Sequence, residues 1–290
     1  MLTKQQALQR MKADIQLRGL SKNTLKSYML HIEIFLNDCD KPIDELTEMD
    51  VRRFLGQLIV EKKLAPGTVN CYSSAIRFFF AVTLNRTMNY LQIPRMKVPK
   101  KLPEILSRDE ISELMEKCYN IKHKALLYMA YGSGLRIDEL ASLKVRDIDS
   151  ESMRVFVRGG KGKKDRYTIL SENALKSLRA YWLKYRPKSP EGFLFPGIKN
   201  IGYISDAAIS NAIDTAQSRT DITKNITAHT FRHCFATHSL EDGYSIFQIK
   251  EMLGHSSISS TTVYLHLANT TAGVISPADR LTEKFEDFPL

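Results

Sequence analysis

Three prolines within eleven residues are the feature that most limits how this chain can fold. They lie in the segment IPRMKVPKKLP, residues 93–103. Proline lacks a backbone N–H and fixes φ, so neither a helix nor a central strand can run through this segment. Because domain-sized stretches lie on both sides, we interpret it as an interdomain linker, with a surface loop as the alternative. The sequence predicts a domain at 1–92, a basic linker at 93–104, a second domain at 105–275 and a C-terminal tail at 276–290.

The composition is that of a globular protein. Hydrophobic residues make up 43% of the 290 residues and charged residues 26%, which excludes a disordered or collagen-like chain. No apolar run approaches the ~20 residues that a membrane span needs, and the N-terminal segment lacks the hydrophobic centre of a signal peptide. We therefore expect a cytoplasmic protein without a membrane span.

Positive charge is concentrated in the first part of the chain. The whole sequence has 42 Lys and Arg against 32 Asp and Glu, a net charge of +10, and residues 1–100 hold 16 basic and nine acidic side chains. A local basic surplus attracts a polyanion, either nucleic acid or an anionic membrane. A generally basic soluble protein is the alternative interpretation.

Hydrophobic spacing predicts the fold class. In the first domain, apolar residues recur at helical intervals from Leu25 to Phe35 and from Val69 to Leu84, which predicts an all-α helical bundle. In the second domain, helical patterns surround two strands at 153–157 and 166–170, joined by a glycine- and lysine-rich turn. We expect a mainly α protein whose second, α+β domain contains a small antiparallel β-sheet.

Two glycine-containing patterns in the second domain place basic side chains at the ends of elements. In GSGLRIDEL, residues 132–140, glycines end one helix and Arg136 lies in the opening turn of the next. A guanidinium there offers paired donors to a phosphate. In GKGKK, residues 160–164, the flanking glycines let Lys161 approach another molecule closely, but the Walker A spacing is missing. Each pattern alone is also typical of a solvated surface turn.

A third pattern places a histidine and an arginine at a helix start. Thr227 is a capping residue, and His229 and Arg232, three apart, share one helix face beside the positive helix end. A zinc site of His229, His233 and Cys234 is the alternative. No glutamate lies between the histidines and no remote ligand set is evident, so we predict no metal and no cofactor.

The fourth pattern is LGHSSISSTTVYLH, residues 253–266. A helix ends at Gly254, so His255 leaves it in a fixed place. A short helix at 260–266 then presents Tyr264, although a tyrosine between two apolar residues is usually part of a core.

Together the four patterns resemble the tyrosine recombinases, also called the phage integrase family. Residues from about Leu102 onward are similar to the family's catalytic domain, and the helical part up to about Tyr90, with its SKNTLKSY start, is similar to its core-binding domain. The resemblance covers nearly the whole chain and suggests a minimal two-domain Xer-like or mobile-element integrase. It implies six catalytic residues, all present: Arg136, Lys161, His229, Arg232, His255 and Tyr264.

The resemblance implies a site-specific recombinase that works through a 3′-phosphotyrosyl intermediate. Tyr264 would attack the scissile phosphate and leave a free 5′-hydroxyl. A tyrosine with its ordinary pKa of ~10 needs a base or cationic surroundings, and His229 is the candidate base. Arg136 and Arg232 would bind the non-bridging oxygens, Lys161 would protonate the leaving oxygen, and His255 would hydrogen-bond a phosphate oxygen. Glu139 orients Arg136 or is a surface carboxylate; the sequence leaves both open.

The resemblance also implies double-stranded DNA as the partner, and no membrane. Two domains would close on the DNA as a clamp, and a tetramer would assemble on two duplexes. Helix faces that could enter DNA grooves, with solvated faces as the alternative, and basic turns give the candidate DNA-binding residues Lys22, Lys26, Asn70, Ser74, Arg77, Lys97, Lys163 and Lys164. In the tail, Leu281, Phe285 and Phe288 recur at helical spacing. The family packs such a tail on a neighbouring protomer, and packing on its own domain is the alternative.

Two other functions use the same residues differently. A catalytically silent DNA-binding regulator would have lost Tyr264 or an arginine, and none is lost. A type IB topoisomerase shares the chemistry but relaxes DNA without pairing specific sites. The helical first domain and the short chain favour the recombinase.

Overall fold

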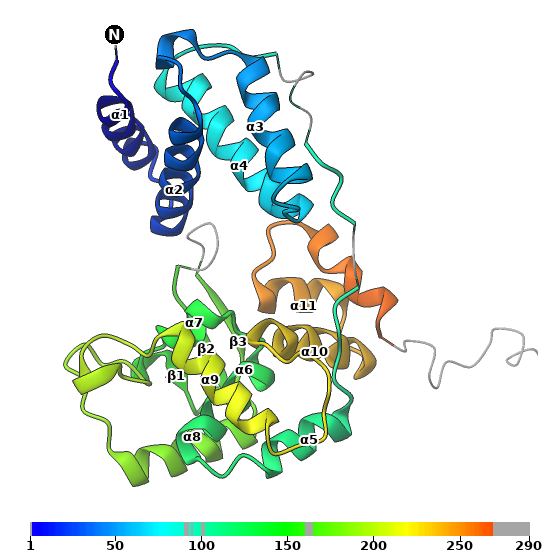
Figure 1. Ribbon diagram of the computed structural model, residues 1–290. Helices are drawn as coiled ribbons and strands as arrows, with labels where there is room; N and C mark the ends of the chain where they lie inside the picture. The colour runs from blue at the N-terminus through cyan, green and yellow to red at the C-terminus, as the bar shows by residue number, and fades with distance from the viewer. Residues whose placement is uncertain (1, 90–92, 94, 100–101, 160–164, 269–290) are drawn as a thin grey trace, which may run out of the picture. The chain divides into compact units, whose positions relative to one another are not determined.

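The computed structural model describes residues 2–89, 93, 95–99, 102–159 and 165–268. The chain divides into two compact units, Met1–Lys101 and Leu102–Leu290. Each unit has its own hydrophobic core. Figure 1 shows helices in both units and the few strands in the second alone, so the expected mainly α fold with a small sheet is confirmed.

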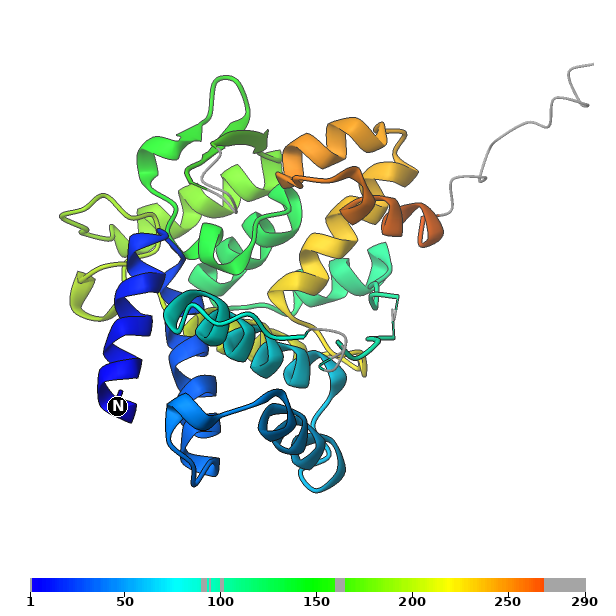
Figure 2. The ribbon, with the colours of Figure 1, turned by 90° about the horizontal axis from the view of Figure 1, so that it is seen from above.

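The first unit is all helical in its described residues. Its α-helices are α1 (Lys4–Leu17), α2 (Lys22–Asp38), α3 (Glu48–Val60) and α4 (Pro66–Phe78), and a π-helical turn, Phe79–Thr83, continues α4. The hydroxyl of Ser21 accepts a hydrogen bond from the backbone N–H of Thr24 and so caps α2. Phe35, Phe54 and Phe80 pack edge to face in the core of this unit. Figures 1 and 2 show the ribbons of α2, α3 and α4 side by side in two views.

The second unit places helices around a short sheet. Its α-helices are α5 (Arg108–Glu116), α6 (Ile121–Ser133), α7 (Ile137–Ala141), α8 (Glu172–Tyr185), α9 (Asp206–Gln217), α10 (Ala228–Glu241) and α11 (Ile246–Leu253). Helix α6 is central, since it packs against α8, α9 and α10. Its residues Ala125, Leu126 and Met129 are fully buried or nearly so.

The sheet is antiparallel and has three strands in the order β1 (Ile148–Asp149), β2 (Arg154–Val157) and β3 (Arg166–Ile169). In its register, Val155 lies opposite Thr168 and Val157 opposite Arg166. The two predicted strands are confirmed, and β1 is an addition, because two residues are too short to show an alternating pattern. Strand β3 packs against α11, and Arg166 on this strand donates to the carbonyl of Met252 near the end of that helix.

The structure also bears on membrane spans and on the cysteines. Among the residues that the structure describes, no helix is both long and apolar enough to span a membrane. Of the four cysteines, Cys71 is exposed, whereas Cys39, Cys118 and Cys234 are buried, and all four are free thiols.

Candidate active site

Arg136 is positioned by the glycine that ends α6. Gly134 has φ +60°, a conformation that glycine adopts readily, and caps the C-terminus of α6. Arg136 is the N-cap residue of α7, one position before the helix, whereas the sequence suggested the opening turn. Its guanidinium donates to Glu139 Oε1 at 2.8 Å, and its backbone N–H donates to Glu139 Oε2 at 2.9 Å. The start of α7 therefore fixes this arginine through one carboxylate.

Glu139 is the centre of a buried charge cluster. Its side chain is 6% exposed, so the alternative of a surface carboxylate is excluded. Besides Arg136, it accepts two hydrogen bonds from Arg166, at 2.8 and 2.7 Å, and lies 3.8 Å from Arg232. Burial alone would raise its pKa, but the bonds from Arg166 and Arg136 outweigh burial and lower the pKa to about 2. One carboxylate thus faces three guanidinium groups, which leaves an excess of positive charge.

Arg166 is a member of this cluster that the sequence interpretation did not identify. Its side chain is 8% exposed, and Nε donates to the carbonyl of Met252 at 2.7 Å. It therefore ties β3 both to α7 and to the end of α11. Local sequence gives no signal for this, since Arg154 on the neighbouring strand is just as charged, yet its side chain is 50% exposed.

Arg232 joins three elements from the face of α10. It is 4% exposed and donates to the carbonyl of Gly134 at 2.8 Å and to that of Leu253. Burial, together with neighbouring Arg136, lowers its pKa to about 10. A buried arginine whose neighbours are mostly cationic is stabilised when a negative group, such as a phosphate, binds beside it.

His229 lies in the first turn of α10 and is exposed. The predicted cap is present, because Thr227 Oγ1 accepts from the backbone N–H of Thr230. The ring of His229 lies 6.3 Å from that of His233, one helical turn further on. Cys234 is buried and bonds to the backbone of Leu106, away from the two histidines, and no metal-binding group occurs among the described His, Cys, Asp and Glu residues.

His255 follows α11 at the predicted position. Gly254, with φ +64°, ends the helix, and His255 Nδ1 lies 2.8 Å from Thr261 Oγ1. Burial lowers the pKa of His255 to about 4, with further contributions from Arg232 and Arg136. Its imidazole is therefore neutral at pH 7.

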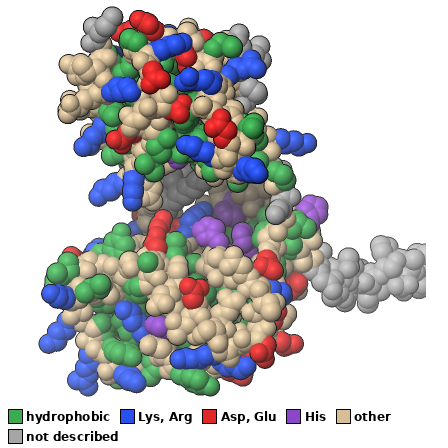
Figure 3. Space-filling model, viewed as in Figure 1, with side chains coloured by type: hydrophobic (Ala, Val, Ile, Leu, Met, Phe, Trp, Pro, Cys, Tyr) green, Lys and Arg blue, Asp and Glu red, His purple; other side chains and the backbone are tan. Residues whose placement is uncertain are grey.

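Tyr264 lies in a short 3₁₀ helix, Thr262–His266, and is 2% exposed. Its hydroxyl is 3.0 Å from Nδ1 of His233, not of His229, the base suggested by the sequence. Burial raises the pKa of Tyr264, while Arg232 and Arg136 act in the opposite direction. Histidine side chains gather on one face of the second unit in Figure 3.

The structure thus brings together four of the six predicted catalytic residues, Arg136, Arg232, His255 and Tyr264. Glu139, which the sequence suggested as a partner of Arg136, lies with them, and the structure adds Arg166 and His233. His229 lies on the same face of α10 as His233. Lys161, Lys163 and Lys164 lie outside the described residues, as does the tail at 276–290. The buried arginines, neutral histidines and tyrosine form a site suited to a phosphate ester.

In the first unit, some candidate DNA-binding side chains have partners within the protein. The side-chain amide of Asn70 donates to the carbonyl of Met96 and accepts from its N–H, both at 2.9 Å. Arg77 donates to the carbonyl of Ile93, and Ser74 accepts from Arg95 at 3.0 Å. These side chains of α4 therefore bind the segment that contains Ile93, Arg95 and Met96. Other candidates, Lys22, Lys26 and Lys97, are exposed.

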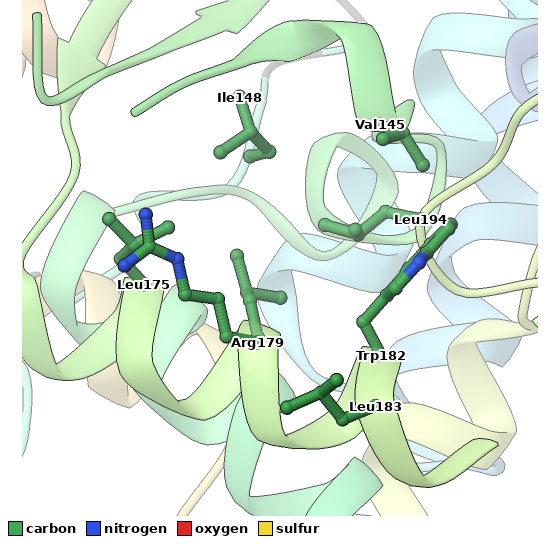
Figure 4. Close-up of a pocket in the computed structure, with 8 residues that line it drawn as sticks. Val145, Ile148, Leu175, Arg179, Trp182, Leu183 and Leu194 are labelled. Atoms are coloured by element: carbon green, nitrogen blue, oxygen red, sulfur yellow. The ribbon is translucent and has the colours of Figure 1, made fainter. Parts of the chain in front are cut away.

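An apolar groove of about 370 Å³ lies elsewhere on the second unit, along α8 (Figure 4). Leu175, Trp182 and Leu183 line it from the helix and Val145 and Ile148 from the opposite side, with Arg179 as its charged residue. It contains neither a nucleophile nor any residue of the charge cluster, so it is separate from the candidate active site.

The chain matches two protein-family models and has relatives among known proteins. Residues 104–271 match the model of the phage integrase family, and residues 7–90 match that of the phage integrase N-terminal SAM-like domain. The putative integrase/recombinase y4qK of Sinorhizobium fredii is 41% identical over 94% of this chain and 88% of that protein. Tyrosine recombinase XerA of Pyrococcus furiosus is 34% identical over 86% of this chain and 85% of that protein.

A solved structure shares the fold. The Tn1549 transposon integrase, in complex with transposon right end DNA, aligns with a TM-score of 0.69 at 18% identity, over 89% of this chain and 94% of that one.

Proposed function

Because this chain belongs to the phage integrase family, the tyrosine recombinases, it is an enzyme that cleaves and rejoins DNA, and we propose that Tyr264 is its nucleophile. The observation that supports this most directly is the surroundings of Tyr264. A buried tyrosine hydroxyl has a hydrogen-bonding histidine and lies within the field of Arg136 and Arg232. Such surroundings stabilise a phenolate and the phosphate that it attacks.

In the proposed reaction, Oη of Tyr264 attacks the scissile phosphorus and the bond to the 5′-oxygen breaks. The products are a 3′-phosphotyrosyl bond and a free 5′-hydroxyl. Arg136 and Arg232 bind the non-bridging oxygens, where negative charge grows in the transition state. Exposed His229 and partly buried His255 donate to phosphate oxygens, and Lys161 protonates the leaving oxygen. The 5′-hydroxyl of a second strand then reverses the step and exchanges strands.

The proposed cycle needs neither ATP nor a metal, because the phosphotyrosyl bond keeps the energy of the phosphodiester. The partner that we propose is a specific double-stranded DNA site, chromosomal or on a mobile element, in the cytoplasm. We further propose that residues 1–92 and 105–275 act as DNA-binding and catalytic domains that clamp the duplex. Four copies would then assemble on two duplexes, with the tail at 276–290 exchanged between protomers.

A nicked suicide duplex tests this function. Candidate site DNA from the gene's neighbourhood is incubated with the wild type or Tyr264→Phe, in EDTA, and covalent adducts are separated on a denaturing gel. We expect an adduct from the wild type alone. Tight binding without an adduct would instead favour a DNA-binding regulator, and an adduct from Tyr264→Phe would identify a different nucleophile.

A further inference from the structure

The hydroxyl of Tyr264 has one hydrogen-bonding side chain in the described structure, and it is His233. Nδ1 of His233 lies 3.0 Å from Oη, with the two rings 5.6 Å apart. The ring of His255 stacks on Tyr264 at 6.4 Å, but its Nδ1 is already bonded to Thr261. Of the three histidines near the nucleophile, His233 alone is placed to exchange a proton with it.

The position of His233 on α10 explains the contact. It follows His229 by four residues, so both lie on the same face of the helix. His229 is in the exposed first turn, whereas His233 is deeper, where α10 packs against the 3₁₀ helix of Tyr264. This separation suits His229 to the bound phosphate and His233 to the nucleophile.

We propose that His233 is a catalytic residue that accepts the phenolic proton of Tyr264 during strand cleavage. The inference rests on the proposed function, since it gives a role in that reaction. In the step, the Oη–H bond breaks and an Nδ1–H bond forms while Oη bonds to phosphorus. The electron pair of the broken P–O bond stays on the 5′-oxygen, which takes its own proton from the general acid. Rejoining runs in reverse, and the proton returns from Nδ1 to Oη.

The charge of His233 before the step suits an acceptor. Burial lowers its pKa to about 4, with His229 and Arg232 adding to the effect, so the imidazole is neutral and Nδ1 can accept at pH 7. Among the described residues, the other charged or titratable groups around the pair are Arg136 and His255. A bound phosphodiester adds negative charge, which raises the pKa of His233 toward its ordinary value and strengthens it as a base.

The test separates proton acceptance from positioning. In His233→Asn, the amide oxygen takes the place of Nδ1 and can accept the hydrogen bond, but it cannot keep a proton. His233→Phe can do neither, and His229→Asn is the matched control on the same helix face. The substrate is a suicide duplex with sulfur in place of the 5′-bridging oxygen, because a thiolate leaves without protonation and cleavage then reports on the nucleophile. Circular dichroism and binding to the same DNA check that each variant folds.

Single-turnover cleavage is followed from pH 6 to 9. The wild-type rate should be nearly flat above about pH 6.5, the ordinary histidine pKa. For His233→Asn and His233→Phe, we expect a loss of about 10²–10³-fold at pH 7. Their rates should also rise about tenfold per pH unit, because Tyr264 must then ionise unaided. His229→Asn should be slower than the wild type but keep the flat profile.

The outcomes distinguish the proposed role of His233 from the proposed recombinase activity on which it rests. A His233→Asn variant that cleaves at the wild-type rate would show that His233 only positions Tyr264, and a steep profile confined to His229→Asn would assign the base to His229. Either result overturns the inference and leaves the recombinase intact. A wild type that binds the duplex but forms no adduct overturns the proposed function and the inference together.

Discussion

The single carboxylate of Glu139 lies within ion-pair distance of three arginines. It bonds to Arg136 and Arg166 and lies near Arg232, and all four side chains are largely buried. Removing the carboxylate leaves cations without their partner, which costs more than the loss of an exposed ion pair. The stability of the second unit and the geometry of the candidate active site therefore depend on the same side chain.

We predict that Glu139→Gln lowers the free energy of unfolding of the second unit by about 3–5 kcal/mol, measured by urea unfolding at pH 7. Because folding lowers the pKa of Glu139 from 4.5 to about 2, its stabilisation is present above pH 4.5 and is lost as the pH falls toward 2. This pH-dependent stabilisation amounts to about 3 kcal/mol, and Glu139→Gln should not show it. The exposed pair of Asp149 and Arg154 gives the control, since Asp149→Asn should leave the urea midpoint unchanged. An unchanged urea midpoint for Glu139→Gln would contradict the stabilising role of the Glu139 carboxylate.

At the scale of elements, Gly134 is where α6, α7 and α10 meet. Its φ is +60°, and a Cβ built on it would lie 2.4 Å from the ring of Phe235 on α10. Its carbonyl also accepts from Arg232. A side chain at this position would push α10 away from the turn that presents Arg136.

Gly134→Ala should therefore destabilise the protein more than a comparable glycine substitution. Gly243 follows α10 with φ +89° and has open space around it, so Gly243→Ala loses only the left-handed preference, about 1–2 kcal/mol. Gly134→Ala adds about 1–3 kcal/mol of overpacking. Urea unfolding of both variants measures the difference. Equal losses of unfolding free energy would mean that the ring of Phe235 moves aside without destabilising the protein.

The sequence predicts elements well where periodicity or capping is strong. The helix after Ser21, the strands before and after the hairpin turn, the cap at Thr227 and the helix end at Gly254 all appear in the structure. These features depend on neighbours within about four residues. Periodicity also implies helix from Val69 to Leu84, but α4 ends at Phe78 and continues as a π-helical turn.

The rest of the site depends on contacts between distant segments. Arg166 and Glu139 are 27 residues apart, and His233 and Tyr264 are 31 residues apart. Nothing local distinguishes these side chains from exposed ones. Asn70 and Arg77 show another kind of distant contact. Their polar helix face makes them candidates for DNA binding, and in the structure their side chains also bond to the backbone of Met96 and Ile93.

At the scale of the whole molecule, the basic surplus of the first 100 residues should set the salt dependence of DNA binding. Lys22 and Lys26 lie one turn apart on α2 and are exposed. If each neutralises one phosphate, changing both to alanine should reduce the slope of log affinity against log salt by about 2. Fluorescence anisotropy from 50 to 300 mM salt measures the slope. Lys62 and Lys63, exposed after α3, give a variant with the same charge change, and an equal reduction there would contradict the placement of DNA at α2.

Cys71 gives the chain a natural attachment point for a probe. It is exposed, while the other three thiols are buried, and burial raises the pKa of Cys39, Cys118 and Cys234, the last to about 11. Maleimides react with thiolates, so brief labelling near neutral pH should place one dye per chain, on α4, without an engineered cysteine. Two dye colours mixed on one DNA molecule would then count protomers by single-molecule fluorescence.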